Sequence, residues 1–293
     1  LTILLNLAGK NSDEPLGTRL KTLSSKPEFT FDTTSSGRQE TLDYFETASS
    51  AQFTRLPSYF NLLPKTEMIV KELPQRRSQS RTMALYIPPK GEPLQEGKLY
   101  VNTWQAHTLT RYLAKTFAYH EGVPGHHLQK SIQAELKDLP TFRRFLPFES
   151  YSEGWAMYAE QLGHEMTGSE DPWDKIGLLQ SDLFRTARMM TDIGIHHKKW
   201  LREQAIDFMV KNAGLAESEA EREVDRYIVW PGQGCAYKVG QLKFLELRNK
   251  ADQVLGDDFD IKEFHDVAIG AGAMPLQVLE QRINEYVARN SKN

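Results

Sequence analysis

Hydrophobic positions recur at helical spacing through most of the chain after residue 105. Residues 108–119 place Leu109, Tyr112, Leu113 and Phe117 on one side, a pattern typical of an amphipathic helix. The same spacing predicts further helices at residues 148–163, 174–210 with a break near Gly194, 218–229, 235–251, 261–269 and 276–289. The second half of the chain is therefore predicted to be almost entirely helical.

The N-terminal part shows a more mixed pattern. Residues 11–39 are rich in Ser, Thr, Gly and Lys and predict a loop or extended linker, whereas residues 38–59 carry apolar side chains near helical spacing. Three short β-prone runs follow, at residues 68–70, 82–87 and 99–102. We expect residues 66–103 to form a small antiparallel sheet, which makes the fold class mainly α with a small antiparallel β-sheet (α+β).

Composition and charge exclude several classes of function. The chain has 293 residues, enough for a sizeable core, and 40% hydrophobic with 26% charged residues is ordinary for a globular protein. The formal net charge of −3 gives no polycationic surface, so no nucleic-acid partner is predicted. No run approaches the roughly twenty apolar residues of a transmembrane segment. Cys235 is the only cysteine, which excludes an internal disulfide and a cysteine metal cluster.

The start of the chain predicts a fragment or a processed product. It begins with Leu1 rather than Met, and its apolar opening lacks the basic start and long hydrophobic centre of a signal peptide. The compartment is left open: periplasm or a membrane-anchored lipoprotein if an N-terminal signal has been removed, cytoplasm otherwise. The oligomeric state is left open as well.

The strongest chemical signal lies in residues 118–129, AYHEGVPGHHLQ, which hold three of the eight histidines. A helical His-Glu-x-x-His motif places two imidazoles one turn apart, so that both reach Zn²⁺ while the glutamate activates water. Here the second histidine follows His120 by six or seven residues. In an unbroken helix His127 would lie about 10 Å further along the axis, at about 1.5 Å per residue, and His126 would point away.

Pro124 and Gly125 offer a way around this spacing. Proline removes a backbone donor and clashes with the preceding turn, whereas glycine accepts unusual dihedral angles. A bulge at these two residues would absorb the extra length and let His120 and His126 face each other. The alternative interpretation is that Pro-Gly ends one helix and leaves the histidines on the surface or at an N-cap.

Residues 151–160, YSEGWAMYAE, add two carboxylates. Catalytic zinc sites of this type take a third ligand from a carboxylate and leave the fourth position to water, so Glu153 is the candidate. Glu160 follows by seven residues on the same helix face and is placed to orient a ligand imidazole as a hydrogen-bond acceptor. The alternative is a solvated face, against which Trp155, Met157 and Tyr158 argue.

These stretches resemble the bacterial DUF885 family, whose signature is similar to His-Glu-x-x-Pro-Gly-His-His-Leu-Gln followed by Glu-Gly-Trp-Ala-x-Tyr-Ala-Glu. Further blocks occur in the same order: LYIPP at 85–89, YVN at 100–102, RTAR at 185–188 with DIGIH at 192–196, and PGQGCAYKVG at 231–240. The family is grouped with zincin-like metallopeptidases of the gluzincin type, and its members are longer than this chain, with a further helical region on the N-terminal side.

The resemblance implies a single Zn²⁺ held by His120, His126 and Glu153, with Glu121 as general base. Relatives with this longer spacing carry glycine directly before the second ligand histidine, which favours His126 and leaves His127 a supporting role beside the metal. Residues 58–293 would form the zincin-like catalytic domain. Residues 1–57 would be a linker and a helix, the remnant of a larger helical region.

Further roles are assigned to residues in the same family-like blocks. Tyr237 and His196 are candidates to donate to the oxyanion of a tetrahedral intermediate. For both, the alternative is a packed or surface side chain. Among the other histidines, His107, His164 and His265 are expected to be structural.

Five more residues are candidates for binding substrate. Arg185, Arg188 and Arg248 are suited to bidentate binding of a substrate carboxylate, although such arginines more often form helix-surface ion pairs. Tyr100 and Asn102 lie on a strand that would pair with an extended peptide, and the alternative is an ordinary edge strand.

The sequence therefore predicts a zinc metallopeptidase that cleaves peptide bonds in short peptides, with carboxypeptidase and dipeptidase activity as the two candidates. Glu121 would take a proton from the attacking water and return it to the leaving amine. Two alternatives remain: a metal-dependent amidohydrolase acting on a non-peptide amide, and a non-catalytic helical binding protein with a degenerate metal site.

Overall fold

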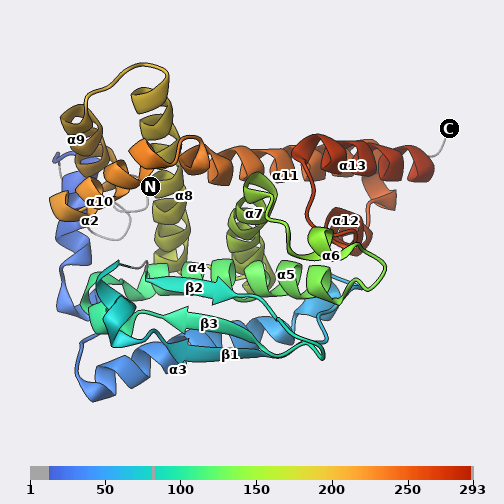
Figure 1. Ribbon diagram of the computed structural model, residues 1–293, viewed down its shortest axis with the longest axis horizontal. Helices are drawn as coiled ribbons and strands as arrows, with labels where there is room; N and C mark the ends of the chain where they lie inside the picture. The colour runs from blue at the N-terminus through green and yellow to red at the C-terminus, as the bar shows by residue number, and fades with distance from the viewer. Residues whose placement is uncertain (1–12, 81–82, 292–293) are drawn as a thin grey trace.

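A computed structural model describes residues 13–80 and 83–291 of the chain (Figure 1). Three strands follow the first helices, and the remainder is helical. The strands and α-helices are α2 (Leu16–Ser24), α3 (Ser35–Phe53), β1 (Met68–Glu72), β2 (Ala84–Ile87), β3 (Gly97–Val101), α4 (Arg111–Glu121), α5 (His126–Glu135), α6 (Thr141–Phe145), α7 (Glu149–Thr167), α8 (Pro172–His196), α9 (Arg202–Ala213), α10 (Glu217–Val229), α11 (Gln233–Leu255), α12 (Ile261–Ile269) and α13 (Leu276–Asn290). The 3-10 turns are η1 (Pro27–Phe29), η2 (Leu56–Ser58), η3 (Gln75–Ser80), η4 (Thr103–Thr108) and η5 (Gly256–Asp258).

The mainly helical prediction with a small sheet is confirmed. Each helix predicted after residue 105 forms, and the long predicted helix breaks after His196, two residues beyond Gly194. The predicted linker at residues 11–39 is wrong, because α2 and the start of α3 lie within it. Leu20 and Leu23 of α2 are buried against Ile176 of α8, so a few apolar side chains hold this otherwise polar segment in a helix.

The sheet is mixed, so the prediction of an antiparallel sheet is wrong in part. Its order is β1-β3-β2, with β2 antiparallel to β3 and β1 parallel to β3. After the β2–β3 hairpin, β3 lies between β2 and β1 and pairs with both. The two outer strands, β1 and β2, therefore run in opposite directions. Tyr100 therefore lies on a central strand, and β3 has no free edge with which to pair a peptide.

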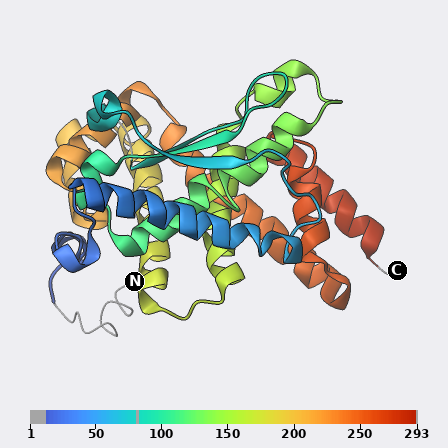
Figure 2. The same cartoon turned by 90° about the horizontal axis from the view of Figure 1, so that it is seen from below.

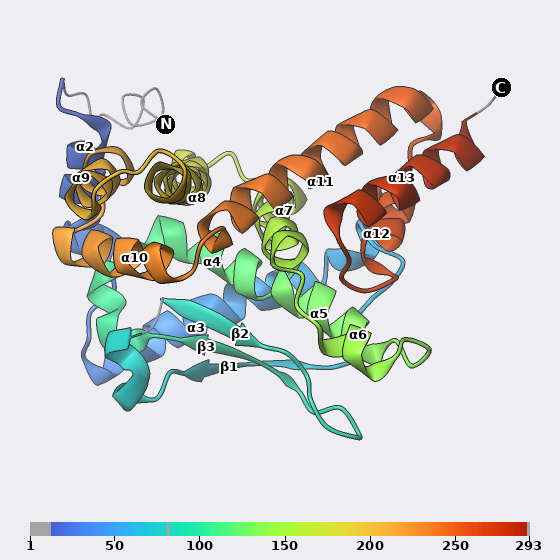
Figure 3. The ribbon, with the colours of Figure 1, turned by 45° about the horizontal axis from the view of Figure 1, so that its top comes forward.

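The helices stack outward from the sheet in layers. Helices α3 and α4 pack on the sheet, where Phe45, Leu99, Val101 and Ala118 share one buried cluster, and Figure 2 shows α3 running alongside the strands. Helices α7 and α8 pack on α4, and the long helix α11 crosses both of them (Figures 1 and 3). The chain therefore places α4, α5 and α7 together in the middle of the molecule.

Helices α7 and α11 approach each other through a pair of glycines. A Cβ atom added to Gly154 would overlap the Cα atom of Gly240, and one added to Gly240 would overlap the carbonyl oxygen of Ser150. Trp155 and Phe244 fill the buried cluster beside this contact. Because Gly154 directly follows Glu153, the contact also sets how α7 presents that carboxylate.

The glycine contact predicts that Gly154→Ala destabilises the protein. Overpacking of this kind costs about 1–3 kcal/mol, whereas the same change in an open helix stabilises by about 0.5–1 kcal/mol. The denaturant midpoint should therefore fall. Gln253→Ala, at an exposed position of α11, should leave the free energy of unfolding within about 0.5 kcal/mol of the parent. A raised midpoint for Gly154→Ala would contradict the packing argument.

Candidate metal and catalytic site

The site begins where α4 ends and α5 begins. His120 and Glu121 occupy the last turn of α4, and His126 is the first residue of α5. The backbone N–H of Gly125 donates to the carbonyl of Tyr119 at 2.9 Å, and that of His127 donates to the carbonyl of Gly122 at 3.0 Å. These bonds span six and five residues, whereas an α-helical bond spans four. The turn is therefore wider than a helical turn.

The predicted bulge thus takes the form of a four-residue break between two helices. The alternative interpretation was correct that one helix ends near Pro124, but the two histidines are buried and do not lie on the surface. Only glycine fits at the end of the break, since a Cβ atom on Gly125 would overlap the carbonyl oxygens of Tyr119 and His120. The indole of Trp155 donates to the carbonyl of Pro124 at 3.0 Å and ties the break to α7.

Three side chains converge across this break. The Nε2 atoms of His120 and His126 lie 3.4 Å and 3.5 Å from the same carboxylate oxygen of Glu153. One ligand atom from each of the three residues lies within 4.8 Å of the other two. Two ligands of a tetrahedral zinc ion, each about 2.0–2.1 Å from the metal, are about 3.4 Å apart. The donor set and its spacing therefore fit such an ion.

Glu160 lies behind His120 and orients its ring. It accepts a hydrogen bond from Nδ1 of His120 at 2.7 Å, which turns Nε2 of the ring toward Glu153. A guanidinium nitrogen of Arg185 lies 3.9 Å from the same Glu160 oxygen, and Arg185 donates to Ser181 at 3.1 Å. Glu160 is almost fully buried, so Arg185 provides the countercharge that a buried carboxylate requires.

The electrostatics of the cluster favour positive charge between the carboxylates. Burial opposes protonation of His120, but its hydrogen bonds with Glu153 and Glu160 outweigh burial and raise its pKa to about 9. Burial likewise opposes the charged form of Glu153, yet the two histidines hold its pKa well below the usual range. Burial lowers the pKa of His126 to about 3, so that ring is neutral at neutral pH and available as a ligand.

Glu121 lies beside the ligand set without joining it. Burial, together with the charge of the neighbouring Glu153, raises the pKa of its carboxyl to about 7 against the opposing effect of His120. A carboxyl group that titrates near neutrality exchanges protons in either direction at working pH, as a general base must.

His127 points the other way, toward the sheet. Its Nδ1 lies 2.8 Å from the hydroxyl of Tyr86 on β2 and 3.2 Å from that of Ser131. Its ring packs edge-on against Phe53 of α3. His127 therefore ties α5 to the sheet, and the structure brings His126 to the cluster.

Tyr237 of α11 lies near the cluster, beside the second arginine of α8. Burial, and then the charge of Glu153, raise the pKa of Tyr237 to about 12, so its hydroxyl stays protonated. The hydroxyl accepts a hydrogen bond from Gln233 at 3.1 Å, which frees its own proton for donation. The guanidinium of Arg188 stacks over the Tyr237 ring at 4.4 Å and lies 3.3 Å from Glu223, so Arg188 is already paired.

Two of the predicted site residues, His196 and Asn102, make hydrogen bonds outside the cluster. His196 contacts the carbonyl of Tyr227 at 2.9 Å, and it stands eleven residues beyond Arg185, about 16 Å along α8 at about 1.5 Å per residue. Asn102 is buried and donates to the carbonyl of Ser78 at 2.8 Å. Both side chains serve packing between elements.

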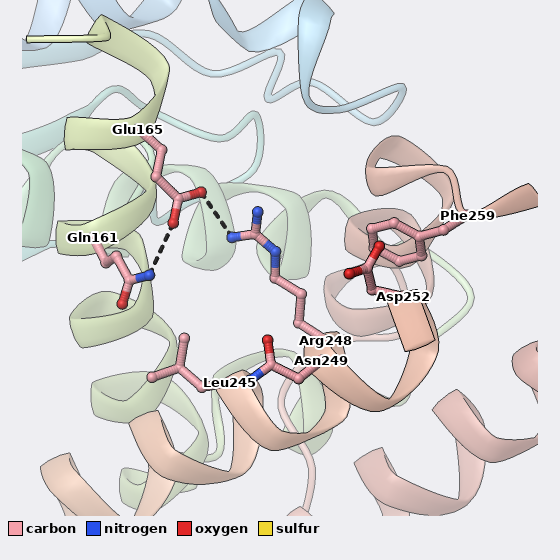
Figure 4. Close-up of a pocket in the computed structure, with 7 residues that line it drawn as sticks. All are labelled: Gln161, Glu165, Leu245, Arg248, Asn249, Asp252 and Phe259. Atoms are coloured by element: carbon pink, nitrogen blue, oxygen red, sulfur yellow. Dashed lines mark hydrogen bonds and ion pairs between the residues drawn. The ribbon is translucent and has the colours of Figure 1, made fainter. Parts of the chain in front are cut away.

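Arg248 lies in a separate pocket of about 220 Å³ between α7 and α11 (Figure 4). It pairs with Glu165 at 2.8 Å, and Gln161 also donates to Glu165. Glu165 is twelve residues beyond Glu153 on α7, about 18 Å along the axis at about 1.5 Å per residue. The structure therefore places Arg248 outside the candidate site.

A cleft of about 550 Å³ opens beside Glu153. Its lining comes from the end of β2, α5, α6 and the start of α7, and comprises Pro88, Pro89, Lys90, Lys130, Gln133, Ala134, Arg144, Phe145, Leu146, Pro147, Glu149, Ser152 and Glu153. Neither Lys130 nor Tyr86 was predicted as a site residue from the sequence. The signal for Lys130 was its position four residues after His126, which puts both on one helix face.

Comparisons with known proteins give a family and two related folds. The sequence profile of the family described as "Bacterial protein of unknown function (DUF885)" matches residues 3–283. The crystal structure of a "putative lipoprotein" from Colwellia psychrerythraea is 35% identical with a TM-score of 0.94, and the match covers 98% of this chain and 49% of that one. A "putative lipoprotein of unknown function" from Shewanella oneidensis is 21% identical with a TM-score of 0.77, over 95% of this chain and 52% of the other, which shows a shared fold.

The chain thus spans about half the length of the solved structures that it matches. No curated protein matches it. Within residues 13–80 and 83–291, no helix has the length and apolar character needed to cross a bilayer.

The hydrogen bond between His120 and Glu160 predicts a measurable pKa change. In chelator-treated protein, Glu160→Gln should lower the pKa of His120 from about 9 by about 1–2 units, because a charge-assisted hydrogen bond contributes about 1.5–3 kcal/mol. NMR titration of the imidazole measures this value. Glu165→Gln on the same helix, whose partner is Arg248, should leave it unchanged. An equal shift in both variants would contradict the assigned contact.

Proposed function

The chain belongs to the DUF885 family, and on that basis we propose that it is a zinc-dependent hydrolase of peptide bonds. One observation carries the proposal: His120, His126 and Glu153 direct ligand atoms at one point, with the carboxyl of Glu121 beside them. Neutral imidazoles and a carboxylate are the ligands that catalytic zinc sites use, and the spacing of 3.4–3.5 Å suits a tetrahedral ion. A zincin-like relationship is part of this proposal.

When bound, Zn²⁺ would supply Lewis acidity that polarises a substrate carbonyl and acidifies water. The other steps fall to side chains. Glu121 takes the proton of the attacking water and delivers it to the nitrogen of the leaving amine. Tyr237, protonated and free to donate, stabilises the oxyanion through a hydrogen bond. Glu160 holds the His120 ring in the orientation that the ligand set needs.

We also propose a location in the bacterial cell envelope. The Colwellia psychrerythraea protein, described as a "putative lipoprotein", is 35% identical over nearly all of this chain, which supports the same location here.

The ligand assignment predicts opposite results for two adjacent histidines. His126→Ala should abolish stoichiometric zinc binding, because it removes one of three ligands. His127→Ala should retain about one equivalent of zinc and lower the melting temperature, because it breaks the tie to Tyr86 and Ser131. Elemental analysis of protein purified without chelator and thermal unfolding measure the two outcomes. Zinc loss in His127→Ala with retention in His126→Ala would refute the assignment.

The role of Glu121 predicts a separation of metal binding from turnover. Glu121→Gln should keep zinc but lower kcat on a peptide library by about 10²–10⁴, the usual contribution of general acid–base catalysis. Glu149→Gln, a carboxylate in the same cleft outside the ligand set, serves as the matched control and should retain most activity. Full activity in Glu121→Gln would refute the role. Cleavage of non-peptide amides alone would favour the amidohydrolase.

A further inference from the structure

Lys130 is a positive charge beside the ligand set that the proposed mechanism does not use. It lies one turn after His126 on the same face of α5, about 6 Å along the axis at about 1.5 Å per residue, and it lines the cleft next to Glu153. Within the described part of the chain its ammonium makes no ion pair. The nearby Glu153 is instead engaged by His120 and His126.

The arginines near the cluster and the cleft already have partners. Arg185 neutralises the buried Glu160, and Arg188 lies against Glu223 and donates to the hydroxyl of Tyr227. Arg144 at the cleft donates two hydrogen bonds to the carbonyl of Ala134. The arginines that the sequence favoured for a substrate carboxylate are therefore occupied. Two lysines line the cleft, Lys90 after β2 and Lys130 on α5, and Lys130 is the one on the helix that carries His126.

Part of the lining of the cleft is apolar. Phe145 and Leu146 are 48% and 42% exposed, although burial of large apolar side chains is favourable. Pro88, Pro89 and Pro147 belong to the same lining. The volume of about 550 Å³ lies within the usual range for small-ligand pockets. In Figure 3 the α6 segment and the β2–β3 connection stand at one end of the molecule, where the ion pair of Arg144 with Glu92 joins them.

We propose that this cleft binds the C-terminal residue of a peptide substrate, with its free carboxylate on Lys130 and an apolar side chain against Phe145 and Leu146. The inference rests on the proposed peptidase function and assigns the enzyme to C-terminal exopeptidases. The carboxylate matches the unpaired ammonium in charge, and the apolar side chain covers exposed apolar surface.

Binding tests the inference without relying on turnover. Calorimetry of the full chain, zinc-loaded and chelator-treated, should show that N-acetyl-leucine binds about tenfold tighter than N-acetyl-leucinamide. Lys130→Met keeps the apolar stem and should remove this preference in both states. Lys137→Met, at an exposed position just beyond α5, should retain it. Equal binding of acid and amide by the parent protein would overturn the inference.

A second ligand identifies the source of the carboxylate. N-acetyl-glutamate α-amide carries its charge on the side chain, and it should bind more weakly than N-acetyl-leucine. Tighter binding of this compound would mean that the cleft prefers an acidic side chain to a C-terminal carboxylate, and it would overturn the proposal.

Kinetics then separates this inference from the proposed function. With matched peptides ending in acid or amide, Lys130→Met should raise KM for the acid about tenfold with little change in kcat, and Lys130→Arg should restore part of the loss. A loss of equal size on both peptides would refute the assigned role. Lys130-dependent binding without any hydrolysis would refute the peptidase alone, whereas hydrolysis of both peptides at equal KM would refute the exopeptidase assignment alone.

Discussion

The break between α4 and α5 is the constraint on which the site depends. Its backbone turns within four residues because Gly125 lies against the carbonyls of Tyr119 and His120, where a side chain does not fit. Trp155 of α7 then fixes the break through the carbonyl of Pro124. Because Glu153 lies two residues before Trp155, the interaction that shapes the turn also brings α7, and with it the third candidate ligand, to the two histidines.

Buried charge around this break is balanced in pairs that extend outward from it. Glu153 faces two imidazoles, Glu160 lies between His120 and Arg185, and the next arginine on α8, Arg188, lies against Glu223. Removing one member of such a pair leaves an uncompensated buried charge. Each arginine is therefore required for the stability of the fold, whether or not it contacts substrate. This explains why residues that match a family-like block on α8 need not contact substrate, and why the open cation lies on α5.

The two sides of the cluster therefore have different chemistry. On the α8 and α11 side, Arg185 and Arg188 have carboxylate partners, and the charge of Glu153 acts on the hydroxyl of Tyr237. The α5 and α6 side is open, with apolar side chains in its lining and with Lys130, which makes no ion pair within residues 13–80 and 83–291. A substrate that reaches the ligand set from the open side would place its reacting bond between these two environments. The difference between the two sides would therefore orient the substrate.

The sequence by itself determined most of the helices after residue 105, whose apolar spacing is local, and the residue types of the candidate site, since the motif around His120 and the glutamates of α7 lie in continuous stretches. It did not predict α2, which is helical where its leucines pack on α8. It left open whether His126 or His127 faces the cluster, because a break can turn either ring inward. Only the tertiary structure decided this, through the contact of His127 with Tyr86. The central position of β3 and the distant places of His196 and Arg248 were also beyond the sequence. Strand order and ion-pair partners depend on residues far apart in the chain, which periodicity does not report.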